Sequence, residues 1–391
     1  MVLLENFGLH DKIEIEDREF HIHTGTVFEK GKIISEVFEN GMFLTLKEYS
    51  IELRNETPNV NNETSNVNYE YLNQITQEFH NYVIDELEAL YRIEQKLNKY
   101  KHPVSHYHLG CLFLRRNLYE EATRQFKRAI DEDPKFVRAY NGLGISFLKA
   151  KQFDKALKVF QKALEQGEKY PDLINYTGLA HLFLGHLDRA ITLFKEAINI
   201  NPNYYECQFN LGVALYKSAL EGVKDPKAVA VPARVIIYLK QARDLERYKH
   251  PLWQKEFNQV LDLLKDNNHE IILPEIEKFQ LKLVDFSSEK EKIYEFYLRF
   301  LFGGEELSLE TIEKYEPFFK VETGNLNKYP DYWNDLGIFH LIKSRSLYLR
   351  ALSEFEKALE LSPEYTEAQR YRDLIKSNEK GFLILLRAIL K

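Results

Sequence analysis

Residues 139–163 read AYNGLGISFLKAKQFDKALKVFQKA, and the main features of this stretch recur along the chain. Glycines stand 34 residues apart at Gly110, Gly144, Gly178 and Gly212. Three further positions keep the same period: Ala122, Ala156 and Ala190; Phe126, Phe160 and Phe194; Ala129, Ala163 and Ala197. Four registers with one period indicate a repeated structural unit, and a period of this length predicts a solenoid.

Each repeated residue has a physical role in a pair of antiparallel helices. The glycine is expected midway along the first helix, where the second helix crosses too closely for a Cβ. The alanines lie seven residues apart on one face of the second helix, which allows close packing, and the phenylalanine between them fills the gap. Pro134 and Pro202 close two of the units, because proline cannot continue a helix. One pair cannot bury its apolar face, but stacked pairs can.

This pattern resembles the tetratricopeptide repeat (TPR) family over residues 103–202. The resemblance implies a mainly α fold, a TPR α-solenoid in which helix hairpins form a right-handed superhelix. A fourth repeat starts well at Asn210-Leu211-Gly212, but its alanine is expected only at Ala242, so a loop is inserted at 222–232. A fifth repeat is expected from Trp333, Leu336, Gly337, Ala351, Phe355, Ala358 and Pro363.

The sequence therefore divides into seven segments. We expect a small antiparallel β domain at 1–54, a polar linker at 55–68, a helical lead-in at 69–101, four TPR repeats at 102–250 with the insertion in the fourth, a helical segment with degenerate or no repeats at 251–330, a fifth TPR with a capping helix at 331–377, and an apolar helix at 378–391. Within 251–330, helices are expected at 253–264, 290–302 and 309–319.

The β domain is predicted from alternating apolar residues and a turn signal. Phe20, Ile22 and Thr24 alternate with polar neighbours, and Asn40-Gly41 favours a tight hairpin. We expect three to five strands. About 50 residues make a marginal core, so the sheet is expected to dock on the solenoid or on a partner.

Composition narrows the class of protein. The 391 residues are 44% hydrophobic and 29% charged, with a net charge of −7, which fits a folded chain and argues against nucleic-acid binding. Cys111 and Cys207 are far apart in sequence and form neither a disulfide framework nor a zinc spacing, so both are expected to be small core or groove residues. No signal peptide or apolar run of about 20 residues occurs, so we expect a cytoplasmic protein without a transmembrane segment. No catalytic or cofactor motif is present, so we expect no enzyme and no cofactor.

The TPR resemblance also implies where a ligand binds, because the first helices of TPR pairs line a concave groove. The family's groove positions fall on Tyr107, Cys111, Arg115, Asn141, Ile145, Lys149, Asn175, Leu179, Phe183, Phe209, Val213 and Lys217. Asparagine amides are able to pair with a peptide main chain, so we expect a partner peptide or helix there. Tyr107 and Cys111 replace the lysine and asparagine of the chaperone-binding subtype. The alternative is that these positions bind nothing, or that the chain's own termini cover them.

Two groups of histidines and the C-terminal helix complete the candidates. His21 and His23 share one face of a strand, but no third ligand is evident, so no metal site is expected. His102 and His106, one helical turn apart, favour a polar helix surface. For the apolar helix at 378–391 three roles stay open: docking onto the last repeat, self-association, or anchoring to a partner or membrane surface.

The function predicted from these features is a non-catalytic scaffold or adaptor that binds another protein. A second resemblance favours an alternative: Phe20-His21-Ile22-His23-Thr24, followed by Ile33-Ile34 and Asn40-Gly41, is similar to a short bacterial domain with a His-Val-Gln-Thr core. That domain is associated with regulators of small Ras-like GTPases, which implies a bacterial polarity or motility complex, although His23 replaces the glutamine. A further alternative is an enzyme with its site in 251–330.

Overall fold

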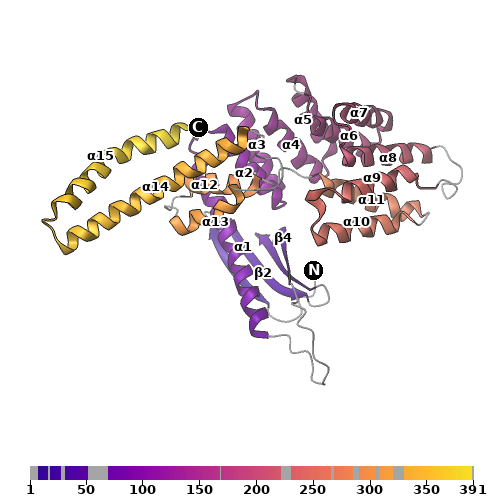
Figure 1. Ribbon diagram of the computed structural model, residues 1–391. Coiled ribbons are helices and arrows are strands. Elements are labelled where there is room, and N and C mark those ends of the chain that lie inside the picture. The colour runs from indigo at the N-terminus through magenta and orange to yellow at the C-terminus, as the bar shows by residue number, and fades with distance from the viewer. Residues whose placement is uncertain are drawn as a thin grey trace. The chain divides into compact units, whose positions relative to one another are not determined.

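The computed structural model describes residues 8–15, 18–27, 31–51, 69–167, 169–221, 230–265, 268–284, 290–303, 308–319 and 330–389. The chain divides into two compact units. The first comprises Met1–Leu112 and Glu289–Lys391, and the second comprises Phe113–Ser288. Most described residues are helical, and the remaining regular structure is one small sheet, so the predicted fold class is confirmed (Figure 1).

The sheet has four antiparallel strands in sequential order: β1 (Leu9–Ile15), β2 (Arg18–Val27), β3 (Lys32–Glu39) and β4 (Met42–Ser50). The hairpin between β3 and β4 turns at Asn40 (φ 48°) and Gly41 (φ 78°). Both angles are positive, as a two-residue hairpin turn of this type requires, so the Asn-Gly prediction is confirmed.

Helix α1 (Tyr69–Leu97) covers one face of this sheet. Phe20 in β2 is fully buried with its ring 5.1 Å from that of Tyr91, and His80 Nδ1 lies 2.8 Å from the hydroxyl of Thr24. The sequence analysis expected the sheet to dock on the solenoid or a partner. Instead the helix that follows the sheet in the chain supplies its core. The predicted linker at 55–68 lies outside the described residues.

Eight helices follow in the pattern of four pairs. They are α2 (Pro103–Arg115), α3 (Tyr119–Glu132), α4 (Val137–Lys149), α5 (Phe153–Glu165), α6 (Pro171–Phe183), α7 (Leu187–Ile200), α8 (Tyr205–Leu220) and α9 (Ala233–Arg243). From α3 to α9 each helix packs on the next (Figure 1). The repeated alanines and phenylalanines of α3, α5 and α7 are fully buried, as the 34-residue period predicted.

The turns inside the first three pairs share a backbone feature that the sequence analysis did not identify. Asn117 (φ 60°), Lys151 (φ 57°) and Gly185 (φ 80°) are all left-handed. They too stand 34 residues apart, seven residues after their repeat glycines. A left-handed residue after a helix ends it and reverses the chain. In the fourth pair the equivalent residue, Ala219, lies inside α8, so this helix continues to Leu220 before the insertion. Most of that insertion, 222–229, lies outside the described residues.

The second unit ends with α10 (Pro251–Leu263) and α11 (His269–Leu283). Helix α10 packs on α9 and on α11. The predicted helix at 253–264 corresponds to α10, whereas α11 was not anticipated, and it contributes several of the residues discussed below.

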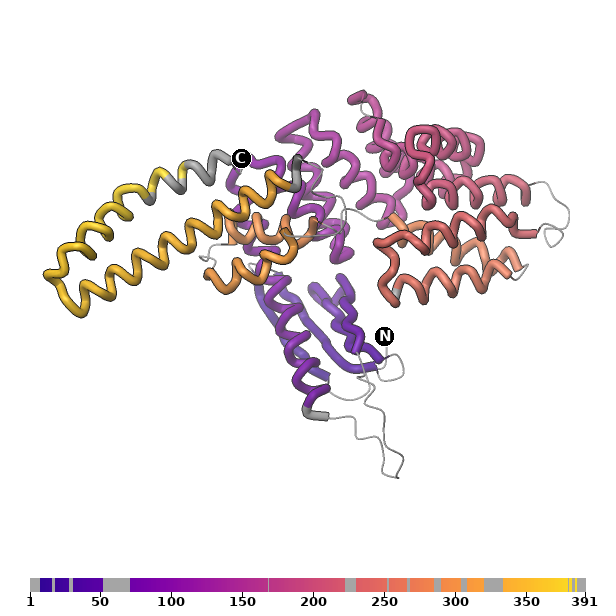
Figure 2. Tube along the Cα trace, in the orientation of Figure 1, coloured from indigo at the N-terminus to yellow at the C-terminus, as the bar shows by residue number. Residues whose placement is uncertain are grey.

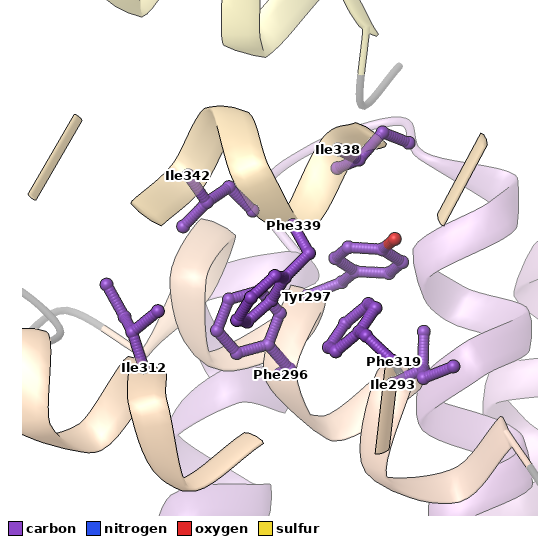
Figure 3. Packing of buried hydrophobic residues seen from close by; sticks show 8 residues of the cluster. All are labelled: Ile293, Phe296, Tyr297, Ile312, Phe319, Ile338, Phe339 and Ile342. Atoms are coloured by element: carbon purple, nitrogen blue, oxygen red, sulfur yellow. The ribbon is translucent and has the colours of Figure 1, made fainter. Parts of the chain in front are cut away.

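Three further helices of the first unit share an aromatic core. They are α12 (Glu291–Phe302), α13 (Leu309–Phe319) and α14 (Pro330–Leu361). Phe296, Phe319 and Phe339 meet at its centre, with the rings of Phe319 and Phe339 stacked 4.5 Å apart (Figure 3). The helices predicted at 290–302 and 309–319 are confirmed.

The prediction of a fifth repeat is wrong, because the expected pair of helices is not formed. Residues 330–361 form one continuous helix, α14, which passes through the expected turn, and α15 (Thr366–Ile389) is its antiparallel partner (Figure 2). The expected capping helix and apolar C-terminal helix are both parts of α15. The physical reason is the sequence between Gly337 and Ala351, which contains no glycine, proline, asparagine or aspartate to end a helix. Ser344 stands where the other repeats turn, and it is helical.

Candidate functional site

The first helices of consecutive pairs form a row in the second unit, because α4 contacts α6 and α6 contacts α8. This row carries nine of the twelve residues that the TPR resemblance assigns to a groove. Those directly after the glycines, Ile145, Leu179 and Val213, are at most 1% exposed, so they pack between helices. Five residues after the glycines, Arg115 is exposed and Lys149, Phe183 and Lys217 are half-buried. The accessible part of the predicted groove is therefore this last set.

Helix α11 covers the predicted groove positions of the fourth repeat. Its Phe279 ring lies 6.5 Å from that of Phe209, and its Glu277 Oε1 lies 2.5 Å from Lys217 Nζ. Phe209 and Val213 are fully buried. The sequence analysis named coverage by the chain's own termini as an alternative, and here an internal helix provides such a cover.

The two predicted groove residues of the first unit are also buried. Tyr107 is 5% exposed with its ring 6.3 Å from that of Tyr294 in α12, and Tyr294 stacks on His108 at 4.0 Å. Cys111 is a free thiol whose pKa is raised well above its usual value, chiefly by burial. Cys111 and Cys207 were expected in the core or in the groove, and both are buried free thiols.

The side-chain amides of the groove asparagines already form hydrogen bonds within the protein, Asn141 through its nitrogen and Asn175 through both of its polar atoms. Asn141 Nδ2 donates to Asp172 Oδ2 at 3.2 Å. Asn175 Nδ2 donates to the Tyr204 hydroxyl at 3.1 Å, and Asn175 Oδ1 accepts from Asn210 Nδ2 at 3.0 Å. The expectation that both amides are open to a peptide main chain is therefore wrong for Asn175, which is bonded at both ends of its amide.

This line of hydrogen bonds extends to α11, where Gln280 Nε2 donates to Asn210 Oδ1 at 2.9 Å. Asn175, Asn210 and Gln280 thus join α6, α8 and α11, and all three are at most 3% exposed. Burial raises the pKa of the Tyr204 hydroxyl well above its usual value, so this end of the line stays neutral. We call these three residues the amide chain.

A small hollow of about 30 Å³ adjoins the amide chain, which is room for roughly two water molecules. It is lined by Asn175, Tyr176, Leu179, Tyr204, Glu206, Asn210, Arg247, Gln280, Leu283 and Val284. Two of these were predicted groove residues, Asn175 and Leu179. The sequence analysis missed the others, since the α11 contribution depends on a helix with no repeat signature.

The polar atoms at this hollow that lack a hydrogen-bond partner among the described residues are acceptors. Glu206 is 5% exposed and pairs with Arg247 through Oε1, while its Oε2 has no hydrogen-bond partner among the described residues. Gln280 Oε1, on a side chain 1% exposed, likewise has none in the described part of the chain. A buried acceptor without a partner is costly, so this site favours a group that donates hydrogen bonds.

A second polar cluster lies on the sheet face opposite α1. His21 and His23 of β2 share a face, as predicted, and β1 brings His10 to them. The sequence analysis found no third ligand, and this is corrected by the strand register, which pairs His10 with His23. The alternation of His10, Lys12 and Glu14 was the available signal, but the register could not be read from sequence. The pKa of His23 is lowered, mainly by burial and then by His10 and His21.

The remaining candidates have structural roles. His102 Nδ1 accepts from the backbone N–H of Ser105 at 3.2 Å at the start of α2, and His106 is fully buried. No helix in the described part of the chain is long and apolar enough to cross a membrane.

Comparison with known proteins supports the repeat assignment. Residues 107–171 match the family model of the tetratricopeptide repeat, and residues 182–218 match a TPR repeat model. The chain therefore contains TPR repeats. Neither match reaches the N-terminal sheet, so its resemblance to a domain linked to regulators of Ras-like GTPases stays a prediction. The comparison with curated proteins found no match.

Similar solved structures are TPR proteins of low identity. YrrB, described as a TPR protein with an unusual peptide-binding site, is 17% identical, with 49% of this chain and 93% of that chain covered and a TM-score of 0.31. MamA is 20% identical, with 43% and 93% covered and a TM-score of 0.35. The C-terminal part of a TPR repeat-containing protein from Cytophaga hutchinsonii is 13% identical, with 68% and 98% covered and a TM-score of 0.30.

Proposed function

We propose that this chain is a non-catalytic scaffold that binds another protein, with a peptide or helix of the partner lying along α4 and α6. TPR repeats support interaction with a protein as the general class of function. The first and fourth repeats have much of their predicted groove covered by α12 and α11, each within its own unit, so α4 and α6 are the part left for a partner.

The observation that carries this proposal is the hollow beside the amide chain. Two residues predicted from the sequence to contact a ligand, Asn175 and Leu179, line it, and its spare polar atoms are the buried acceptors of Glu206 and Gln280. Its volume of about 30 Å³ is too small for a main chain but fits the tip of one side chain. We propose that a donor group of the partner, such as a lysine ammonium, is anchored there.

A second acceptor lies on the neighbouring helix. Asn141 Oδ1 has no partner among the described residues, although the side chain is only 9% exposed and its Nδ2 is held by Asp172. It would accept a backbone N–H of a peptide that continues from the hollow towards α4. A cytoplasmic adaptor role follows from the sequence analysis, and regulation of a small GTPase is kept as the alternative that the N-terminal resemblance suggests.

The test uses Glu206→Gln, which keeps the size of the side chain and its hydrogen bond to Arg247 but converts the spare acceptor into a donor. Partners are first captured from a lysate of the source cells on the immobilised full chain, and each is then titrated against purified variants. We expect Glu206→Gln to weaken binding at least tenfold, because hydrogen bonds to charged groups are worth about 1.5–3 kcal/mol.

The matched control is Glu196→Gln on α7, where the glutamate also forms an ion pair, with Lys169 at 3.0 Å. This variant should bind as the wild type does. Equal affinity of folded Glu206→Gln and wild type would remove the hollow as the anchor, and the absence of any captured partner that survives titration would contradict the scaffold role itself.

A further inference from the structure

Three imidazoles meet on the face of the N-terminal sheet opposite α1. His10 lies on β1 and His21 and His23 lie on β2, where antiparallel pairing sets His10 opposite His23 and places His21 diagonally from His10. One ring nitrogen from each histidine lies within 4.8 Å of the other two. The rings of His10 and His23 are in edge contact, 4.4 Å apart. Residues from two strands thus converge, although only two of them are near in sequence.

The distance between two of the nitrogens matches that of ligands on a metal ion. His10 Nε2 and His21 Nδ1 are 3.2 Å apart. Two nitrogens that bind zinc tetrahedrally at about 2.0–2.1 Å from the ion lie about 3.3–3.4 Å from each other. Without an ion, one of these facing nitrogens carries a proton for the other to accept. A metal ion can take the place of that proton with little movement of the rings.

Glu19 orients one of these ligands. Its Oε1 lies 2.7 Å from His21 Nε2, and its other oxygen is held by Lys12 Nζ at 2.7 Å. A carboxylate on Nε2 keeps the proton there, so the lone pair of His21 is on Nδ1, which faces His10. A carboxylate that accepts from the second nitrogen of a ligating histidine is the usual outer partner in protein zinc sites.

The chain offers a contrast in His80, on the covered face of the same sheet. That imidazole is 1% exposed and has a partner at each nitrogen, Thr24 at 2.8 Å and Asp11 at 3.1 Å, as a structural histidine does. His10 is exposed and His21 and His23 are half-buried, so an ion from solvent has access to the cluster.

We propose that His10, His21 and His23 bind one Zn²⁺ ion. Neutral imidazole is a preferred ligand of zinc, and three protein ligands leave a position that water fills. Because β1 is an edge strand of the sheet, the ion would also fasten it to β2. The cluster shares no residue with the TPR hollow, so this inference is independent of the proposed function.

The experiment is calorimetric titration of the metal-free full chain with Zn²⁺ alone, together with thermal unfolding with and without the ion. We expect one equivalent to bind, with a rise in the melting temperature on zinc addition. His10→Gln, His21→Ala and His23→Ala should each lower the affinity at least 100-fold. Glu19→Ala should lower it about 10- to 100-fold without a change in stoichiometry, because it removes only the outer partner.

The control is His186→Ala in the second unit. His181 Nδ1 and His186 Nδ1 are also 3.2 Å apart, but no third imidazole joins them within the described residues. This variant should titrate as the wild type does. Circular dichroism confirms folding of each variant, and exposed His10 is the substitution least able to disturb it. A wild type that binds no Zn²⁺, or a folded His10→Gln chain that binds it with unchanged affinity, would overturn the proposal.

Discussion

The ring of Phe160 occupies the space that a Cβ on Gly144 would need. A Cβ built on Gly144 would lie 2.2 Å from Cε1 of Phe160, whose side chain is fully buried. The same relationship recurs one repeat later, where a Cβ on Gly178 would lie 2.7 Å from Cε1 of Phe194. Glycine and phenylalanine therefore share the 34-residue period because each makes room for the other.

Gly144→Ala should destabilise the second unit. Alanine is the better helix former by about 1 kcal/mol, but here the new methyl group overpacks a fully buried ring, at a cost of roughly 1–3 kcal/mol. Thermal unfolding followed by circular dichroism measures the balance. The control is Gly337→Ala in α14, where no heavy atom of the described chain lies within 4 Å of an added Cβ, so it should raise stability. If Gly144→Ala and Gly337→Ala both raised the melting temperature, the contact with Phe160 would not limit the size of residue 144.

Gly185→Ala should also be destabilising, for a different reason. No described atom lies within 4 Å of an added Cβ there, but φ is +80°, which costs an L-residue roughly 1–2 kcal/mol. Gly185→Asn should cost less, because asparagine tolerates this conformation and Asn117 adopts it in the equivalent turn two repeats earlier (φ 60°). We expect the melting temperature to be highest for the wild type, lower for Gly185→Asn and lowest for Gly185→Ala. Equal values for the two variants would refute the backbone explanation.

The repeat architecture could be predicted from sequence because its determinants are local and periodic. Glycine, alanine and phenylalanine recur at fixed spacing, and each has one role in each helix pair. The fifth repeat was mispredicted because these packing residues recur at Gly337, Phe355 and Ala358 without a turn. The missing signal was the left-handed residue seven positions after the glycine, seen at Asn117, Lys151 and Gly185.

The candidate sites were harder to predict because they depend on contacts that are distant in sequence. Gln280 joins Asn210 across 70 residues, and α11, which carries Gln280, has no repeat signature. His10 joins His23 only through the register of two strands, and a shift of one residue would send it to the opposite face. The residue types in the sequence suggested which polar side chains are candidates for binding a ligand, but contacts between distant residues decide whether those side chains are available.

Stability should fall at alkaline pH through Cys207. Burial raises the pKa of this thiol, which is fully buried with Sγ 3.5 Å from the carbonyl of Phe194. In the unfolded chain a thiol ionises near pH 8.5, so the folded state binds more protons above that pH. The contribution of Cys207 is complete below about pH 8.5 and is lost as pH rises, by up to about 1.4 kcal/mol per pH unit.

Urea unfolding at pH 8, 9 and 10 tests this dependence on Cys207. Between pH 8.5 and 10, Cys207→Ala should lose about 1.6 kcal/mol less stability than the wild type, because both proteins share the ionisation of tyrosine and differ only in this thiol. The alanine variant is expected to be less stable at pH 8, since it leaves a small cavity, so the slopes and not the absolute values are compared. Parallel curves for the two proteins would show that Cys207 does not titrate between the folded and unfolded states.

The amide chain predicts a specific cost for Asn210→Ala. The variant leaves Asn175 Oδ1 and Gln280 Nε2 without their partner, and both side chains are at most 2% exposed. Each buried polar group left unsatisfied costs about 1–3 kcal/mol, so the two together predict a loss of about 2–6 kcal/mol.

The loss should be felt most in α11, because its Gln280 donates a buried hydrogen bond to Asn210 of α8. Backbone amides of α11 are expected to exchange hydrogen faster in Asn210→Ala, whereas amides of α5 should change little. Asn199→Ala, an exposed position on α7, should stay within about 0.5 kcal/mol of the wild type in stability.

A double variant tests whether the two side chains act together. Asn210→Ala combined with Gln280→Leu should lose less stability than the sum of the losses in the two single variants, since residues of one hydrogen-bond network couple by about 0.5–3 kcal/mol. Additive free energies would show that the two side chains act separately, and α11 would then be held by its apolar contacts, which include those of Phe279 with Phe209 and Phe257.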